Sequence, residues 1–286
     1  MPELPDLLFI NTYLSANVRG RTITDLTLQQ PVVLRNPFAE PADALIRGSR
    51  VTTTRVRGPF LVLSLSCGKD LVLNLMLAGH LHHQRGGEKP PGWLCASLVL
   101  DDLSRLHLAD EKKMAKLYLA EPTRTTHIPR FDTQGVDILS NDFTRDYFGD
   151  LAARHRRKQV RVFLNDQTIL SAIGNAYADE ILFEARIHPK TLVASLGEDQ
   201  LTVLFESIGT VIGRGIEAVA AAKGPIHVKV RDHMKVRNRR GTPCPRCGTT
   251  IRREGVRGYD VFFCPTCQSP TRKSFIDWRK DDHPSQ

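Results

Sequence analysis

The sequence of 286 residues lacks any uninterrupted apolar run of the ~18 residues that a membrane-spanning helix needs. Its first ten residues, MPELPDLLFI, contain two acids and no basic residue, so they lack the charge pattern of a secretory signal. We also find no internal repeat and no low-complexity tract, which excludes repeat arrays. We therefore expect a cytoplasmic protein in a reducing environment, with no membrane partner.

Acidic residues are scarce relative to basic ones. Asp and Glu number 31 against 40 Lys and Arg, which gives a formal net charge of +9. This excess favours a polyanionic partner, because each phosphate that Lys or Arg neutralises releases counterions. Composition alone leaves DNA, RNA and an anionic membrane surface open. Hydrophobic residues make up 41% of the chain, close to the average for globular proteins, which argues against wholesale disorder.

Cysteine is scarce outside one short segment. Cys67 and Cys95 stand alone in or beside predicted strands, and we interpret them as ordinary apolar positions. The other four form two CxxC pairs: Cys244, Cys247, Cys264 and Cys267. Four thiolates at this spacing can close a tetrahedral, structural zinc site, whereas the alternative of redox-active thiols does not explain two matched pairs. The segment between the pairs predicts a hairpin, with Gly255 and Gly258 at its turn.

The first part of the chain predicts one helix followed by strands. Residues 5–18 place Pro5 in a first helical turn and Leu7, Ile10 and Leu14 on one apolar side. Short segments rich in Val, Leu and Thr follow, and we predict strands at residues 22–27, 60–65, 71–75 and 94–100. Strands without long helices between them favour an antiparallel sandwich or barrel.

Helical patterns dominate from about residue 140 to 222, after a linker-like segment at residues 122–133. We expect Asp142 to cap the first of these helices and Ile187-His188-Pro189 to end another. Residues 223–240 are strongly basic and contain a single acid, Asp232. Such a run is either a solvated surface or a phosphate-binding surface, and its position just before the cysteine pairs favours phosphate binding.

Three motifs, in order along the chain, resemble one protein family. They are the N-terminal sequence MPELP, the central IGNAYADE followed by Ile187-His188-Pro189, and GTPCPRC with FCPTCQ near the end. Together they resemble the formamidopyrimidine-DNA glycosylase/endonuclease VIII family over nearly the whole chain. The resemblance implies an α+β fold: an N-terminal antiparallel β-sandwich with a flanking helix, a helical helix–two-turn–helix domain and a C-terminal zinc-finger hairpin. It also implies one structural zinc ion and a DNA partner that contains a damaged base or abasic site.

The resemblance further implies that Pro2 and Glu3 carry the chemistry. Once Met1 is removed, Pro2 has a free amine, and an ordinary α-amino pKa near ~8 leaves part of it neutral and nucleophilic at physiological pH. The amine would attack C1′ of a damaged nucleotide and form an iminium ion, which permits strand cleavage by elimination. Glu3 would protonate the sugar ring oxygen as the ring opens. A retained Met1 would abolish this mechanism, because the Pro2 nitrogen would then be an amide.

Matching positions also imply DNA contacts. Asn175 matches the family position that binds a phosphate beside the lesion, at the start of a predicted helix. Lys112 and Lys113 lie in a stretch that usually supplies an arginine. Leu77 and Met114 match side chains that fill the gap left by the flipped base, although plain core packing is equally open for both.

Three phosphate-contacting positions depart from the family pattern. Pro59 stands where a lysine is usual, Asn74 where a histidine is common, and Tyr259, five residues before Cys264, where an arginine is usual. Arg257 lies two residues from Tyr259 and could substitute for that arginine. Each charged contact is worth about 1.5–3 kcal/mol, so these changes predict a different lesion preference or weak activity.

We therefore predict a monomeric DNA-repair enzyme, a DNA glycosylase with AP lyase activity, associated with the nucleoid if the source is bacterial. The alternatives are a catalytically weak or inactive relative that binds damaged DNA on the same scaffold, and a zinc-ribbon interaction protein whose basic charge is incidental. The predicted segments are a β-sandwich domain at 1–122, a linker at 123–133, a helix–two-turn–helix domain at 134–240, a zinc finger at 241–275 and a tail at 276–286.

Overall fold

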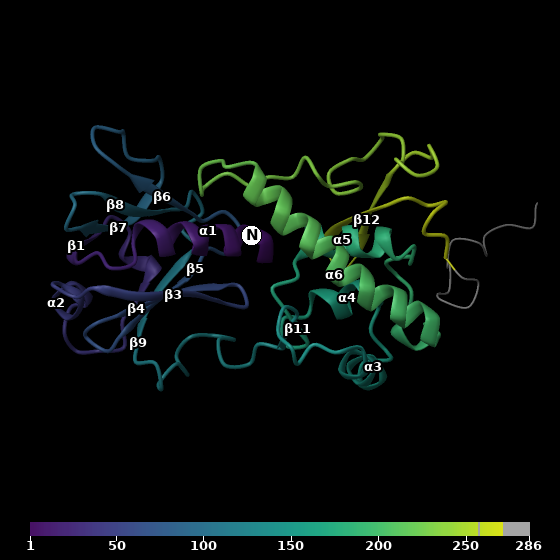
Figure 1. Ribbon diagram of the computed structural model, residues 1–286, viewed down its shortest axis with the longest axis horizontal. Coiled ribbons are helices and arrows are strands. Elements are labelled where there is room, and N and C mark those ends of the chain that lie inside the picture. Colours follow the sequence, from purple (N-terminus) through teal and green to yellow (C-terminus); the bar gives the residue numbers. More distant parts are fainter. Residues whose placement is uncertain (257, 271–286) are drawn as a thin grey trace, which may run out of the picture. The chain divides into compact units, whose positions relative to one another are not determined.

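The computed structural model describes residues 1–256 and 258–270 (Figure 1). The described chain divides into two compact units. The first contains residues 1–135 and 212–233, and the second contains residues 136–211 and the described residues from Met234 on. This division differs from the predicted domains, because residues 212–233 pack with the N-terminal part of the chain. The predicted domain boundaries stay a prediction. No helix among the described residues is long and apolar enough to cross a bilayer.

The first unit consists of two β-sheets and a flanking helix, α1 (Leu4–Asn17). One sheet has the strand order β1-β7-β8-β6, and the other has the order β2-β9-β5-β4-β3. All neighbouring strands run antiparallel except β2 and β9, which are parallel. The strands are β1 (Ile23–Leu28), β2 (Leu34–Arg35), β3 (Val51–Arg57), β4 (Phe60–Leu65), β5 (Asp70–Asn74), β6 (His80–Gln84), β7 (Leu94–Leu100), β8 (Arg105–Ala109) and β9 (Lys116–Ala120). The short helices η1 (Pro31–Val33) and α2 (Ala42–Ile46) lie between β1 and β3 in the chain.

The core of the first unit lies between these sheets. Leucines from both sheets, such as Leu63 on β4 and Leu98 on β7, belong to one buried cluster with Leu7, Ile10 and Leu14 of α1. Helix α1 packs on β3 and β4. The predicted sandwich with a flanking helix is therefore confirmed.

Residues 123–133, predicted as a linker, take part in the packing of the first unit. Ile128 and Phe131 are buried with Phe60, Val62 and Tyr118 in a second apolar cluster on the sheet that contains β4 and β9. The two phenyl rings of Phe60 and Phe131 meet edge to face, with their centroids 5.2 Å apart. This cluster explains why β4 is apolar on both faces.

The second unit is mainly helical. Its elements are β10 (Val136–Asp137), α3 (Arg145–Arg154), α4 (Val160–Asn165), β11 (Leu170–Ser171), α5 (Asn175–Glu184), η2 (Val193–Ser195), the first part of α6 (Glu198–Ala221), and the hairpin β12 (Arg252–Val256) with β13 (Tyr259–Phe263). The expected cap at Asp142 is wrong. Thr144 is the N-cap residue of α3, because its hydroxyl accepts the Tyr147 backbone N–H at 3.2 Å and Asp142 lies two residues too early to do so. Helix α5 ends before Ile187-His188-Pro189, as predicted.

Candidate functional site

The first residues of the chain are fixed by the beginning of α1. Glu3 is the N-cap residue, and its backbone N–H donates to Asp6 Oδ2 at 2.9 Å. In return, the Glu3 side chain accepts the backbone N–H of Asp6. This reciprocal capping box satisfies two donors that a helix start otherwise leaves unpaired. Pro2 and Glu3 are both buried, so the residues predicted to carry the chemistry have one defined position within the first unit.

Arg231 holds a second segment of the first unit against this helix start. Its guanidinium donates two hydrogen bonds to the Asp6 carboxylate, Nη1 to Oδ1 at 2.8 Å and Nη2 to Oδ2 at 2.6 Å. The Asp6 side chain is only 6% exposed, so the ion pair is largely shielded from water. Sequence reasoning missed Asp6, although an acid three residues after a helix N-cap is the signal of a capping box.

A small cavity lies beside Pro2. Pro2, Asp6, Leu75, His227 and Lys229 are among the residues that line it. The α-amino group of Met1 donates to the Leu77 carbonyl at 3.1 Å. Burial, and then the positive charge of Lys229, lower the pKa of this amino group from 8.0 to about 6. The Met1 amine is therefore mostly neutral at pH 7.

Two neighbouring turns of the first unit carry exposed apolar side chains. Leu77, which follows β5, is 56% exposed, and Met114, which precedes β9, is 40% exposed. The two turns lie against each other. Gly79 belongs to the turn after β5 and Ala115 to the turn before β9, and a Cβ atom added to Gly79 would lie only 2.7 Å from the Cβ atom of Ala115. Core packing, one of the two interpretations of Leu77 and Met114, is therefore wrong, and gap filling stays a prediction.

The polar residues of these turns shape the backbone around them. The Asp110 carboxylate accepts the backbone N–H groups of Lys112, Met114 and Ala115 at 2.9, 2.9 and 2.7 Å. This leaves the Lys112 and Lys113 side chains exposed on a fixed turn. Asn74 shapes the other turn, since its Oδ1 accepts the backbone N–H of Met76 at 3.0 Å.

Asn175 is the first residue of α5 in the second unit. Its side-chain Oδ1 accepts two hydrogen bonds, from Arg161 Nη2 at 3.0 Å and from Asn165 Nδ2 at 2.9 Å. Because both donors hold the oxygen, the orientation of the amide is settled and its NH₂ group is the part that remains to donate elsewhere. A donor at the beginning of a helix is suited to an anion, because the backbone N–H groups and the helix dipole act in the same direction.

A buried ion network supports Asn175, and sequence reasoning did not find it. The Asp179 carboxylate, fully buried on α5, binds Arg161 Nε at 2.9 Å and Arg237 Nη1 at 2.7 Å. It also accepts the backbone N–H of Phe262 on β13 at 3.2 Å. The network therefore joins α4, α5 and the hairpin within the second unit. The one signal in the sequence is an Asp-Glu pair inside an otherwise apolar helix, at residues 179–180.

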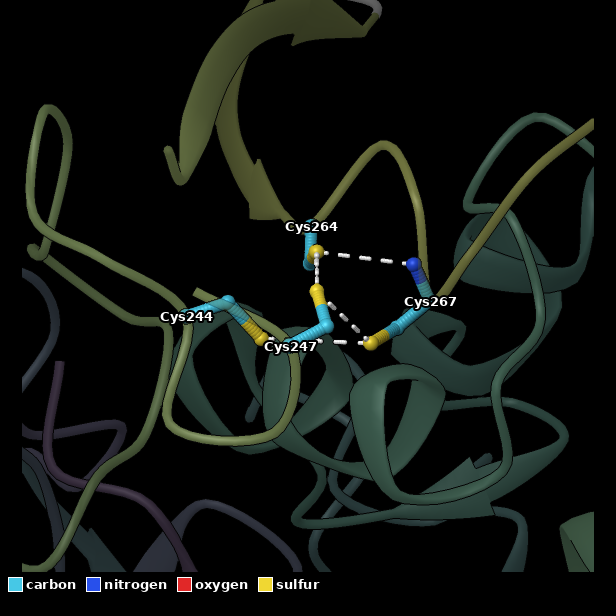
Figure 2. Close-up of side chains that lie close together, drawn as sticks. All are labelled: Cys244, Cys247, Cys264 and Cys267. Carbon is cyan, nitrogen blue, oxygen red and sulfur yellow. Dashed lines mark hydrogen bonds between the residues drawn. The ribbon is translucent and has the colours of Figure 1, made fainter. Parts of the chain in front are cut away.

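The four cysteines of the CxxC pairs converge (Figure 2). Sulfur–sulfur distances are 3.9 Å for Cys244–Cys267, 3.5 Å for Cys247–Cys264 and 3.4 Å for Cys247–Cys267. A tetrahedral zinc ion with Zn–S bonds of ~2.3 Å sets its ligands about 3.8 Å apart, so the donor set fits this ion. The backbone N–H groups of Arg246 and Cys267 donate to the Cys244 and Cys264 sulfurs, both at 3.4 Å, which stabilises thiolates.

The hairpin positions predicted to contact DNA are only partly described. Tyr259 begins β13 and is 59% exposed. Arg257, predicted as a substitute for a missing arginine, lies outside the described residues. Next to Tyr259, Asp260 forms an ion pair with Arg253 at 2.7 Å.

The basic run at residues 223–240, expected to bind phosphates, has several of its cations engaged in ion pairs within the fold. Several of its cations bind carboxylates of their own compact unit: Arg231 binds Asp6 at 2.6 Å, Lys235 binds Glu184 at 3.2 Å and Arg237 binds Asp179 at 2.7 Å. These side chains hold the fold together, so they are poorly available to phosphates.

Three protein-family profiles match successive parts of this chain. They are the formamidopyrimidine-DNA glycosylase N-terminal domain at residues 1–117, the H2TH domain of the same proteins at 134–224, and the zinc finger found in FPG and IleRS at 241–270. The formamidopyrimidine-DNA glycosylase of Chloroflexus aggregans is 33% identical, over 94% of this chain and 98% of its own. The protein of the same name from Pelotomaculum thermopropionicum is 30% identical, over 94% and 99%. The chain belongs to the formamidopyrimidine-DNA glycosylase family.

Solved structures agree with this family assignment. The MutM (Fpg) protein of Thermus thermophilus superimposes with a TM-score of 0.82 at 28% identity, over 93% of this chain and 98% of its own. The Lactococcus lactis enzyme, crystallised with DNA that contains an AP site, superimposes with a TM-score of 0.84 at 22% identity, over 94% and 100%, and shows the shared fold.

The family also settles the nature of the metal centre. Its zinc-finger profile covers all four cysteines, and their geometry leaves no open position for a substrate. In this glycosylase-family member, Cys244, Cys247, Cys264 and Cys267 therefore hold one structural zinc ion, as predicted.

Proposed function

We propose that this family member is a DNA glycosylase with AP lyase activity, in which Pro2 is the nucleophile. The observation that carries the proposal is the position of the chain's first residues. The Met1 amine lies in a partly buried setting beside Lys229, where its pKa falls to about 6, and the adjacent Pro2 is buried and lines a cavity. An ordinary flexible N-terminus would leave its amine solvated, protonated and without a defined position.

The proposed chemistry follows from that amine. The lone pair of the Pro2 nitrogen attacks C1′ of the damaged nucleotide, and the bond from C1′ to the base breaks. The C1′–O4′ bond then opens as Glu3 gives a proton to O4′, and the nitrogen loses its own proton to leave an iminium ion. Loss of the now acidic proton at C2′ expels the 3′ phosphate and cleaves the strand.

The proposed DNA contacts draw on both compact units. We assign the outward NH₂ group of Asn175 to a phosphate, and Leu77 and Met114, which are exposed on adjacent turns, to the gap left by a flipped base. Further proposed contacts are Lys112, Lys113, Asn74, Tyr259 and Arg257. The DNA partner is carried over from the relatives, whose names and crystal contents specify it.

Borohydride trapping on abasic-site DNA tests the proposal. We expect the processed protein to form a covalent adduct, and a variant with extra residues ahead of Pro2 to form none. Glu3→Gln leaves the amine in place, so it should slow adduct formation without blocking DNA binding. Salt-sensitive binding without any adduct in the processed protein would contradict the enzyme and favour an inactive damaged-DNA-binding relative.

A further inference from the structure

The segment from the end of α3 to the beginning of α4 concentrates exposed arginines that form no ion pair among the described residues. We call residues 153–158 the arginine loop; its sequence is ARHRRK. Arg154, Arg156 and Arg157 are exposed, and within the described part of the chain none of the three has a carboxylate at ion-pair distance. By contrast, three cations of the longer basic run at 223–240 form ion pairs within their own compact units.

The backbone of the arginine loop is rigidly held. The carbonyl of Arg156 accepts the backbone N–H of Ala194 at 3.0 Å, and the carbonyl of Lys158 accepts that of Val193 at 2.9 Å. The Lys158 ammonium binds Asp166 at 2.7 Å. A held backbone fixes the positions from which the arginine side chains extend, which lowers the backbone entropy lost when they bind a ligand.

The chemistry of the loop suits one kind of ligand. Guanidinium groups match the oxygens of a phosphate with two parallel hydrogen bonds, and three of them close together need several phosphates in a row. The loop lines a surface hollow formed by residues 153–158 alone. It also leads directly into α4, from which Arg161 holds the Asn175 amide. The loop and Asn175 are thus parts of one compact unit joined by one short helix.

We propose that the arginine loop is a second phosphate-binding surface of this protein, distinct from Asn175, which binds the backbone of duplex DNA outside the lesion. The identification of the polyanion as DNA rests on the proposed function. The surface adds affinity through counterion release and takes no part in the chemistry at the damaged nucleotide.

The salt dependence of DNA binding tests this proposal. The triple variant Arg154→Ala/Arg156→Ala/Arg157→Ala is compared with the wild-type protein on a long duplex that carries a stable abasic-site analogue. Each lost phosphate contact lowers the slope of log K against log salt by ~0.9, so we expect a decrease of about 2–3 and a loss of affinity of at least about tenfold at low salt. The adduct yield with saturating enzyme should be unchanged.

Two further variants test whether the effect depends on the positive charge and on the position of these arginines. Arg154→Lys/Arg156→Lys/Arg157→Lys keeps the charges and should keep most of the slope. Arg19→Ala/Arg50→Ala/Arg105→Ala removes three exposed arginines from the first unit and should change the slope much less. Zinc content and thermal unfolding confirm that each variant is folded.

The outcomes separate this proposal from the proposed function. Equal slopes for the wild-type protein and the alanine variant of the loop would overturn the proposed phosphate-binding surface. Equal effects of the triple alanine variants of the loop and of the first unit would do the same. So would unchanged DNA binding with loss of affinity for a polyglutamate peptide, since the loop would then serve an acidic protein. If the wild-type protein forms no adduct but the slopes still differ, the catalytic proposal fails and the phosphate surface stands.

Discussion

At the scale of single residues, Asp6 determines how the beginning of the chain is presented. One carboxylate caps α1 through the Glu3 backbone and also binds the Arg231 guanidinium. The segment that Arg231 anchors carries Lys229, the cation that helps to lower the pKa of the terminal amine. The reactivity we assign to Pro2 therefore depends on a residue that never touches the substrate.

The first prediction concerns Arg231→Ala. Removal of the guanidinium leaves a buried carboxylate unpaired, so we expect a loss of about 3 kcal/mol in the free energy of unfolding, measured by urea denaturation. Arg47→Ala, which breaks exposed ion pairs with Asp25 and Asp43, should cost much less, because surface ion pairs are screened by solvent. The pH midpoint of adduct formation should rise, because Lys229 and Arg231 both lower the pKa of the amine at the beginning of the chain. Similar losses of stability in the two variants would refute the importance of the buried pair.

The second prediction separates the two ends of the Asn175 amide. In Asn175→Asp the carboxylate still accepts from Arg161 and Asn165, but the outward donor is replaced by an anion. We expect unfolding to be nearly unchanged, and affinity for abasic-site DNA to fall by about 1.5–3 kcal/mol or more. Asn175→Ala removes the donor without adding charge and should bind DNA better than Asn175→Asp. DNA affinity equal to wild type in Asn175→Asp would exclude the phosphate contact.

At the scale of elements, the β12–β13 hairpin has too little apolar surface to fold alone. Phe262 and Ile251 are buried with Cys244 and Cys264, so the core of the hairpin and the metal ligands are the same cluster. A structural zinc ion contributes about 10–16 kcal/mol of apparent binding energy in small zinc-finger peptides, which exceeds what such a core supplies. The hairpin in turn holds Phe262, whose N–H binds Asp179.

The third prediction is that this hairpin requires its metal. We expect one zinc ion per chain by elemental analysis, and loss of that ion in Cys264→Ser. The apo variant should show loss of protection of the hairpin amides in hydrogen exchange, together with weaker DNA binding. Cys67→Ser is the matched control, because Cys67 is exposed and lies outside the cysteine cluster. Retention of zinc by Cys264→Ser, or its loss from Cys67→Ser, would contradict the assignment of the ligands.

Helices and strands also differ in how well their sequences predict them. The strands at 60–65 and 94–100 were predicted with their observed bounds, because each is a run of strand length that is apolar except for one serine. Strand β6, with the sequence HLHHQ, was missed because only Leu81 and His83 face the interior and histidine hides the alternation. Strand β8 was also missed, because His107 is buried on the face opposite the core leucines Leu106 and Leu108, so the strand lacks a polar and an apolar face.

At the scale of the whole molecule, each compact unit buries a neutral histidine. Burial lowers the pKa of His107 in the first unit and of His188 in the second from 6.5 to about 4. In the unfolded chain both protonate near their ordinary value, so the unfolded state binds more protons between pH 6.5 and about 4. The stability of both units is therefore complete above pH 6.5 and declines as the pH falls through this range.

The fourth prediction is the resulting acid sensitivity. Each histidine should contribute about 1–3 kcal/mol of lost stability between pH 6.5 and 4, which urea unfolding at several pH values measures. The variant His107→Gln can keep a hydrogen bond to Ser97 without titrating, so its stability should depend less on pH. An identical pH dependence in His107→Gln and wild type would show that folding leaves the pKa of His107 unchanged and would contradict the prediction.

The sequence by itself determined the α+β class, the family and the zinc ligands of this protein. These depend on local features. Each periodic segment, each short motif and each CxxC pair is formed by residues that lie close together in the sequence. Only the tertiary structure decided which cations are available to a ligand. Arg231 and Arg237 lie within a basic run, yet their carboxylate partners are 225 and 58 residues away along the chain. Ion pairs of such long sequence separation form only when folding brings the partners together, so composition and spacing could not reveal them.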